Sequence, residues 1–212
     1  MRLDHVSYVA SHDQISDVVN RIGSQIGTAF VDGGIHPKFG TRNFTAPLLN
    51  GQYIEIVCPL DHPATDATPF GQAVKKKADA GGGWLTWVFR TSNIKDFEES
   101  FGRKAVEGLR IKPDGSKLTW KQIGVKGLQE SNGQPFFIEW LSNNHPSMNG
   151  DPKAKIIKIK IEENEILELN LSNRIAKSLK EDDIVLDKSQ EKFSNGIESI
   201  FLQSKGDLVE IK

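Results

Sequence analysis

Imidazole and carboxylate side chains stand at regular places in strand-like segments of this sequence. His5 lies in a segment rich in β-forming residues, and Glu55 and Glu139 each stand between bulky apolar neighbours. Successive side chains of a strand point to opposite faces, so we expect these polar groups to face away from the helices that cover the apolar ones. An imidazole with two carboxylates on rigid strands is a suitable set of ligands for a divalent metal ion. Solvated glutamates and a structural histidine are the alternative interpretation.

Other residues suit the binding or conversion of a small molecule. His36 is expected in a loop, where it could act as a general base near neutral pH or simply bond the backbone. Arg42 suits bidentate binding of a carboxylate or phosphate, although it could equally pair with a surface acid. Tryptophans could form the apolar wall of a pocket. The residues predicted to contact a substrate are Arg42, Asn43, Trp84, Trp120 and Gln122.

The composition narrows the class of protein. The 212 residues carry 27 Lys and Arg against 28 Asp and Glu, a balance that argues against a nucleic-acid partner. The single cysteine excludes an internal disulfide framework and fits a cytoplasmic location. No apolar run follows the first residues and no stretch approaches ~20 apolar residues, so we expect neither a signal peptide nor a membrane span.

The residues that carry chemistry are concentrated in the first part of the chain. All 5 His, all 4 Trp and both Tyr lie within residues 1–150. The segment 142–152 is rich in Ser, Asn, Pro and Gly, which is typical of a boundary between domains. We therefore expect the site in the first part and a plainer domain after the boundary.

A unit of one strand, one helix and three strands is predicted three times. The units span about residues 3–58, 84–141 and 156–211. The last strand of each unit contains a glutamate between apolar residues, and the spacing of the units is regular, which indicates internal duplication. An α+β protein whose strands and helices happen to alternate is the alternative.

Several of these features resemble the vicinal oxygen chelate superfamily, which includes glyoxalase I, extradiol dioxygenases and bleomycin-resistance proteins. The opening strand, the β-α-β-β-β order and the strand glutamates carry this resemblance. More narrowly, the first 148 residues resemble the bacterial glyoxalase-like domain family. The segments that carry the narrower resemblance are HPKFGTRN at 36–43, YIE at 53–55, GGGW at 81–84 and WKQIG at 120–124.

The resemblance implies an α+β fold in which two βαβββ modules, residues 1–148, form an open cup-shaped barrel. Residues 153–212 would add a third βαβββ-like module. Because such modules work in pairs, we expect the third to pack against its own cup or to pair with a second chain as a homodimer.

The resemblance also implies a site. In metal-dependent relatives the first and last strands of both modules hold one ion, which here assigns His5, Glu55 and Glu139 as ligands. The fourth position falls near Trp84, which cannot bind a metal. The sequence is thus compatible with one Mn, Fe, Co, Ni or Zn ion and also with no metal.

Two functions from different classes follow. The first is a metal-dependent lyase, isomerase or dioxygenase acting on a small oxygenated molecule, with Glu139 or His36 moving a proton. The second is a metal-free protein of the bleomycin-resistance type that sequesters a small molecule. The retained ligands favour the first function, and Trp84 in the fourth position favours the second.

Overall fold

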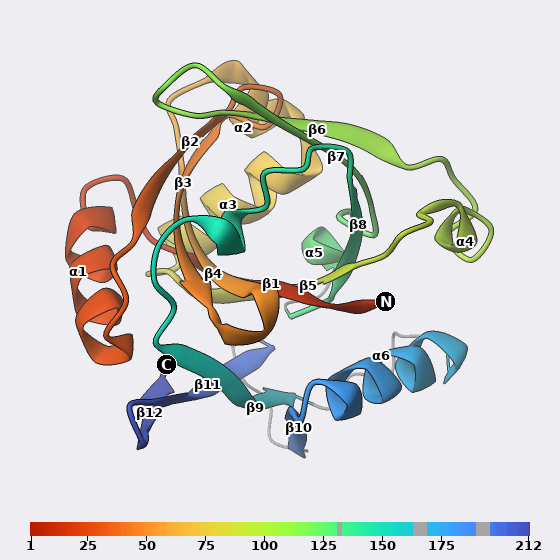
Figure 1. The fold of residues 1–212 in the computed structure, drawn as a ribbon. Helices are drawn as coiled ribbons and strands as arrows, with labels where there is room; N and C mark the ends of the chain where they lie inside the picture. The colour runs from red at the N-terminus through yellow and green to blue at the C-terminus, as the bar shows by residue number, and fades with distance from the viewer. Residues whose placement is uncertain (131–132, 163–168, 190–195) are drawn as a thin grey trace.

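The computed structural model describes residues 1–130, 133–162, 169–189 and 196–212, which form a barrel with a second sheet beside it (Figure 1). The barrel strands, in hydrogen-bonded order, are β1 (Arg2–Val9), β4 (Gln52–Pro59), β3 (Thr41–Leu48), β2 (Val31–His36), β6 (Val106–Ile111), β7 (Lys117–Ile123), β8 (Phe136–Trp140) and β5 (Gly83–Arg90). The second sheet contains β10 (Val185–Ser189), β9 (Ala154–Glu162), β11 (Ile197–Ser204) and β12 (Asp207–Ile211). The helices are α1 (Ile15–Ile26), α2 (Pro63–Ala67), α3 (Pro69–Asp79), α4 (Lys95–Glu98), α5 (Gly127–Glu130) and α6 (Leu169–Glu181), with short 3₁₀ turns η1 (Leu49–Gly51) and η2 (Pro146–Met148).

Two β-α-β-β-β modules build the barrel, as the sequence predicts. In each module the first strand pairs in parallel with the last, β1 with β4 and β5 with β8. The modules meet along β1 and β5, which pair over seven residue pairs, and along β2 and β6, which share the single pair Ile35 and Ile111. The expected open cup is therefore closed by one residue pair. The second strand of the first module, β2, begins at Val31.

Helix α1 shows how apolar spacing sets the outer layer of the first module. Its buried residues Ile15, Ile22 and Ile26 recur at helical spacing and join the same apolar cluster as Ile54 and Ile56 of β4. The helix ends at Gly27, whose left-handed backbone favours glycine. Because the isoleucines of β4 turn outward to this helix, Glu55 between them turns into the barrel.

Helix α3, from the connection between the modules, lies across the barrel (Figure 1). Its residues Phe70 and Val74 are buried in one apolar cluster with Val57, Trp120 and Phe136 of the barrel strands. The helix therefore fills much of the barrel and leaves only a small space for the polar side chains.

The C-terminal segment follows the expected order of elements but pairs its strands differently. Strand β9 pairs in parallel with the next strand, β10, and antiparallel with β11, whereas the first strand of each barrel module pairs with the last. Strand β12 lies at the edge of the sheet, next to β11 alone. The third unit thus shares the β-α-β-β-β order with the barrel modules and not their strand topology.

The second sheet packs on the outside of the β1–β5 seam. One apolar cluster joins Leu3 and Trp84 of the barrel with Ile159, Ile200 and Leu202 of the sheet. An apolar face of the second sheet is therefore covered by the barrel of the same chain. None of the helices in the described part of the chain is both long and apolar enough to traverse a lipid bilayer.

Candidate functional site

The barrel encloses a cavity of about 30 Å³ whose wall combines ionisable and aromatic side chains. A space of this size holds about two water molecules. Its ionisable lining residues are His5, His36, Tyr53, Glu55 and Arg110. Its other lining residues are Phe39, Phe70, Trp120, Gln122, Phe136, Ile138 and Trp140.

Asp4 and His5 are consecutive in β1, yet their side chains reach each other. The register of β1 against β5 shifts between Leu3 and His5, which leaves Asp4 as a bulge. A bulge re-aims side chains that strict alternation would send to opposite faces. His5 Nδ1 lies 2.8 Å from Asp4 Oδ2, so the carboxylate holds the proton on this nitrogen. His5 Nε2 then faces Glu55, with its nitrogen 3.9 Å from Oε2.

Asp4 also anchors a second imidazole. His145 Nε2 lies 2.9 Å from Asp4 Oδ1, while His145 Nδ1 accepts a hydrogen bond from the backbone of Ser147, so Nε2 carries the proton. Trp140 Nε1 donates to the same carboxylate over 3.3 Å. Burial would raise the pKa of Asp4, but the hydrogen bonds from His145 and His5 hold it well below its usual range. The carboxylate therefore stays ionised at neutral pH.

Glu55 is a second buried carboxylate with its own donors. Ser7 Oγ donates to Oε2 and Asn43 Nδ2 donates to Oε1, each over 2.6 Å. Burial would raise the pKa of Glu55, but electrostatic interaction with the His5 and His36 rings and these two hydrogen bonds lower it overall. The interior thus holds two ionised carboxylates on the strands of the first module.

Arg110 is the cation of the cavity. Its side chain is 2% exposed, and its Nε and Nη2 atoms have no hydrogen-bond partner within the described part of the chain. Gly33 leaves room for it, because a Cβ at that glycine would lie 3.1 Å from Arg110 Nη1 and 2.2 Å from Asn43 Oδ1. A guanidinium with buried, unused N–H groups is arranged to receive an anion such as a carboxylate or phosphate.

His36 lies at the aromatic side of the cavity. Its Nδ1 is 2.9 Å from Thr41 Oγ1, and its ring packs between Phe39, Phe70 and Trp120. Burial lowers the pKa of His36 to about 4, against the smaller opposing effect of Glu55. His36 is therefore a neutral imidazole at pH 7.

Five predicted site residues lie in the cavity wall and a sixth lies just behind it. His5, Glu55, His36, Trp120 and Gln122 line the cavity, and Asn43 bonds Glu55. Trp120 Nε1 donates to Gln122 Oε1 over 2.7 Å. The amide nitrogen of Gln122 therefore points away from Trp120 Nε1. His5 and Glu55, from the first and last strands of the first module, face each other in this cavity.

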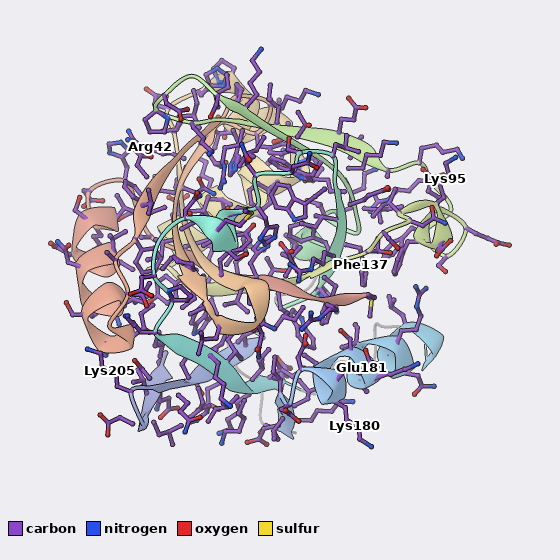
Figure 2. The ribbon with its side chains drawn as sticks, in the orientation of Figure 1. Arg42, Lys95, Phe137, Lys180, Glu181 and Lys205 are labelled. Atoms are coloured by element: carbon purple, nitrogen blue, oxygen red, sulfur yellow. The ribbon has the colours of Figure 1, made fainter. Side chains whose placement is uncertain are left out.

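Arg42 and Trp84 lie outside the barrel, which corrects the prediction that they contact a substrate. Arg42 is an outward residue of β3 (Figure 2) that pairs with Asp32 and lies over the ring of Phe44. Trp84 packs under the second sheet and donates from Nε1 to the carbonyl of Ile211 over 2.9 Å. The role of Trp84 is therefore to pack the C-terminal sheet onto the barrel.

Glu139 also faces outward, away from His5 and Glu55. The cavity positions of β8 are Phe136, Ile138 and Trp140, so strand alternation turns Glu139 to the opposite side. There its Oε2 accepts a hydrogen bond from the backbone N–H of Ile94, just before α4, over 3.1 Å. The next residue, Trp140, lines the cavity.

The side chains present do not form the expected three-ligand metal centre. Only His5 and Glu55 of the predicted ligands face each other, and the described residues contain no group of three or more His, Cys, Asp or Glu side chains suited to a metal ion. Arg110 adds a positive charge to the same small space, which disfavours a cation there.

Sequence reasoning missed Asp4, Tyr53, Arg110 and His145. Arg110 stands between Leu109 and Ile111, the same pattern that marked Glu55, so this signal was present. Tyr53 stacks on His5 with ring centres 4.4 Å apart, and burial raises its pKa well above the usual value. Asp4 depends on a bulge, and His145 lies in the turn-rich segment, so neither had a signal in the sequence.

Comparisons with known proteins agree with this architecture. The family model described as a glyoxalase-like domain matches residues 3–175. A search of curated proteins finds no significant match. Among solved structures, a hypothetical protein from Staphylococcus aureus superposes with a TM-score of 0.53 at 20% identity, covering 99% of this chain and 84% of that one. Methylmalonyl-CoA epimerase from Mycobacterium tuberculosis gives a TM-score of 0.43 at 16% identity, covering 65% and 87%. The chain belongs to the glyoxalase-like domain family, as its strands and motifs indicated.

Proposed function

We propose that this protein binds a small molecule with a carboxylate or similar oxyanion inside the barrel and moves a proton on it, as an isomerase or lyase does. One observation carries the proposal. His5 and Arg110 line the same buried cavity, and Arg110 Nε and Nη2 have no hydrogen-bond partner among the described residues. An anion-binding group beside an oriented imidazole is the minimal equipment for proton abstraction next to a carbonyl group.

His5 is the proposed general base. The Asp4 carboxylate keeps the proton on Nδ1, so Nε2 offers its lone pair to the cavity. The C–H proton moves to Nε2, and the electron pair of that bond moves into the adjacent carbonyl to form an enolate. Glu55, 3.9 Å from Nε2, stabilises the imidazolium that results.

Arg110 holds the substrate's anionic group and the charge that develops on the oxygen. The free amide nitrogen of Gln122 is a second donor toward that oxygen. Return of the proton from His5 to the other face or to a neighbouring carbon gives an isomer, and expulsion of a leaving group gives a lyase reaction.

A metal-free binding protein is the second candidate, because six aromatic side chains line the same small cavity. They are Phe39, Tyr53, Phe70, Trp120, Phe136 and Trp140. Such a wall favours an aromatic or apolar anion that is held without being converted.

Solvent deuterium separates the two candidates. The protein is incubated in D₂O with a panel of small 2-oxo and 3-oxo carboxylates, and the carbon next to the carbonyl is followed by proton NMR. We expect exchange with at least one member, lost in His5→Gln and with binding weakened about 100-fold in Arg110→Met. Arg42→Met is the matched control, because it removes an arginine of the same barrel that points outward.

Binding without exchange would instead support the sequestering protein. Exchange that survives in Arg110→Met at the wild-type affinity would contradict the role of the guanidinium. Binding and exchange absent across the whole panel would exclude small oxo-carboxylates as the substrate class.

A further inference from the structure

A groove of about 660 Å³ adjoins the inner cavity and is far larger than it. It lies between the residues that follow β2, the start of α3, and strands β6 and β7. Phe39, Phe70 and Gln122 line both the groove and the inner cavity. A molecule that places a few atoms beside Arg110 would therefore extend past these three side chains into the groove.

The groove is strongly positive although the protein as a whole has a formal charge of −1. Its charged lining residues are Lys38, Arg103, Lys104, Lys126 and Glu107. Lys104 is engaged with Glu98 over 2.8 Å, and Lys38 donates to the backbone carbonyl of Glu107 over 3.3 Å. Within the described part of the chain no carboxylate pairs with Arg103 or Lys126, so these two cations are available to a ligand.

The rest of the groove is apolar. Val106, Ile123 and Val125 line it together with the two phenylalanines that border the inner cavity. The side chain of Val106 is 60% exposed, which leaves apolar surface open beside the cations. Apolar surface next to unpaired cations matches the tail of an amphipathic anion.

We infer that this groove is a second subsite, which binds the distal phosphate-bearing part of an extended amphipathic ligand whose reacting group lies beside Arg110. The inference rests on the proposed function for the inner group. Lys and Arg side chains bind phosphate by charge-assisted hydrogen bonds, and the apolar lining accepts the connecting stem. The substrate is thus larger than the cavity of the barrel.

Paired probes test the subsite independently of catalysis. Binding of 1-naphthyl phosphate and of 1-naphthol, which differ only in the phosphate, is measured by calorimetry at low salt and at about 0.15 M salt. We expect the phosphate to improve the affinity of the wild-type protein at least about tenfold, less at the higher salt. The Arg103→Ala, Lys126→Ala double variant should lose this advantage.

The control double variant Lys177→Ala, Lys180→Ala removes the same charge from exposed positions of α6 that do not line the groove, and it should keep the advantage. Circular dichroism of each variant checks that it is folded. An advantage that survives in the groove variant, or that is lost in Arg110→Met instead, would overturn the inference, and so would a wild-type protein that binds neither probe. Failure of deuterium exchange with intact, groove-dependent phosphate binding would overturn the proposed function alone.

Discussion

The first barrel module supplies hydrogen-bonded, ionised groups, whereas the second supplies mostly apolar wall. At the β1–β5 seam His5 pairs directly with Val88. The last strand of the first module presents Tyr53 and Glu55 to the cavity, and that of the second presents Phe136 and Ile138. The two modules share a strand order, yet the buried carboxylates of the site, Asp4 and Glu55, both lie in the first module. Modules with the same topology therefore need not have the same chemistry. The apolar wall of the second module excludes water, which strengthens the electrostatic interactions of the first.

Among the tests of this difference between the modules, the largest effect is expected from removing the charge of Asp4. Asp4→Asn should lower the free energy of unfolding by about 3–5 kcal/mol, because it leaves the donors of His5, Trp140 and His145 without their carboxylate. Urea denaturation at pH 7 measures this effect. Asp61→Asn, at an exposed position, is the control and should change little. A loss below about 1 kcal/mol would mean that the buried network contributes no more than an exposed charge does.

The buried His36 gives a test by pH. The pKa of His36 falls from 6.5 to about 4 on burial, so below pH 6.5 the unfolded chain takes up a proton before the folded protein does. Stability from this group is complete above pH 6.5 and decreases toward pH 4, by about 3 kcal/mol in all. His36→Phe should remove this part of the pH dependence. Parallel stability curves for the two proteins between these pH values would contradict the neutral imidazole.

A smaller effect is expected from the wall of the second module. Trp120→Phe removes the hydrogen bond to Gln122, which should cost about 1–2 kcal/mol of stability and leave deuterium exchange within a few fold of wild type. Trp87→Phe is matched to it, since Trp87 Nε1 donates to the carbonyl of Gly133 over 2.9 Å and does not line the cavity. If Trp120→Phe abolished exchange while Trp87→Phe did not, the aromatic wall of the second module would take part in the proton transfer.

The smallest effect belongs to Glu139. Glu139→Gln keeps an acceptor for the backbone N–H of Ile94, so we expect a loss of about 0.5 kcal/mol and unchanged exchange. Thermal unfolding and the NMR assay measure the two quantities. Loss of deuterium exchange in this variant would mean that the Glu139 carboxylate of the second module takes part in the reaction.

Alternating apolar and polar residues predicted the barrel strands and the inward turn of Glu55, because a buried outer helix requires the isoleucines on either side of it. The same argument failed for Glu139, whose neighbours Ile138 and Trp140 are apolar residues of the cavity wall. Apolar neighbours therefore show that a strand residue faces away from them. They do not show whether those neighbours pack under an outer helix or line the cavity.

The remaining differences have local causes that a sequence pattern does not contain. The bulge at Asp4 breaks alternation in β1. Trp84 has the size and polarity of a pocket wall, but the C-terminal sheet provides the apolar surface and the carbonyl that it contacts instead. The order of the elements does not determine which strands pair, so it could not predict that β9 pairs with both β10 and β11.

The single pair that joins β2 to β6 has a mechanical consequence. A ligand larger than the inner cavity needs the barrel to widen. Opening the β2–β6 seam breaks one residue pair, whereas opening the β1–β5 seam would break seven. The C-terminal sheet packs behind the β1–β5 seam, so we expect any opening of the barrel to occur at the β2–β6 seam. Amides at Ile35 and Ile111 would then report each opening through their hydrogen exchange, and a bound ligand would slow it.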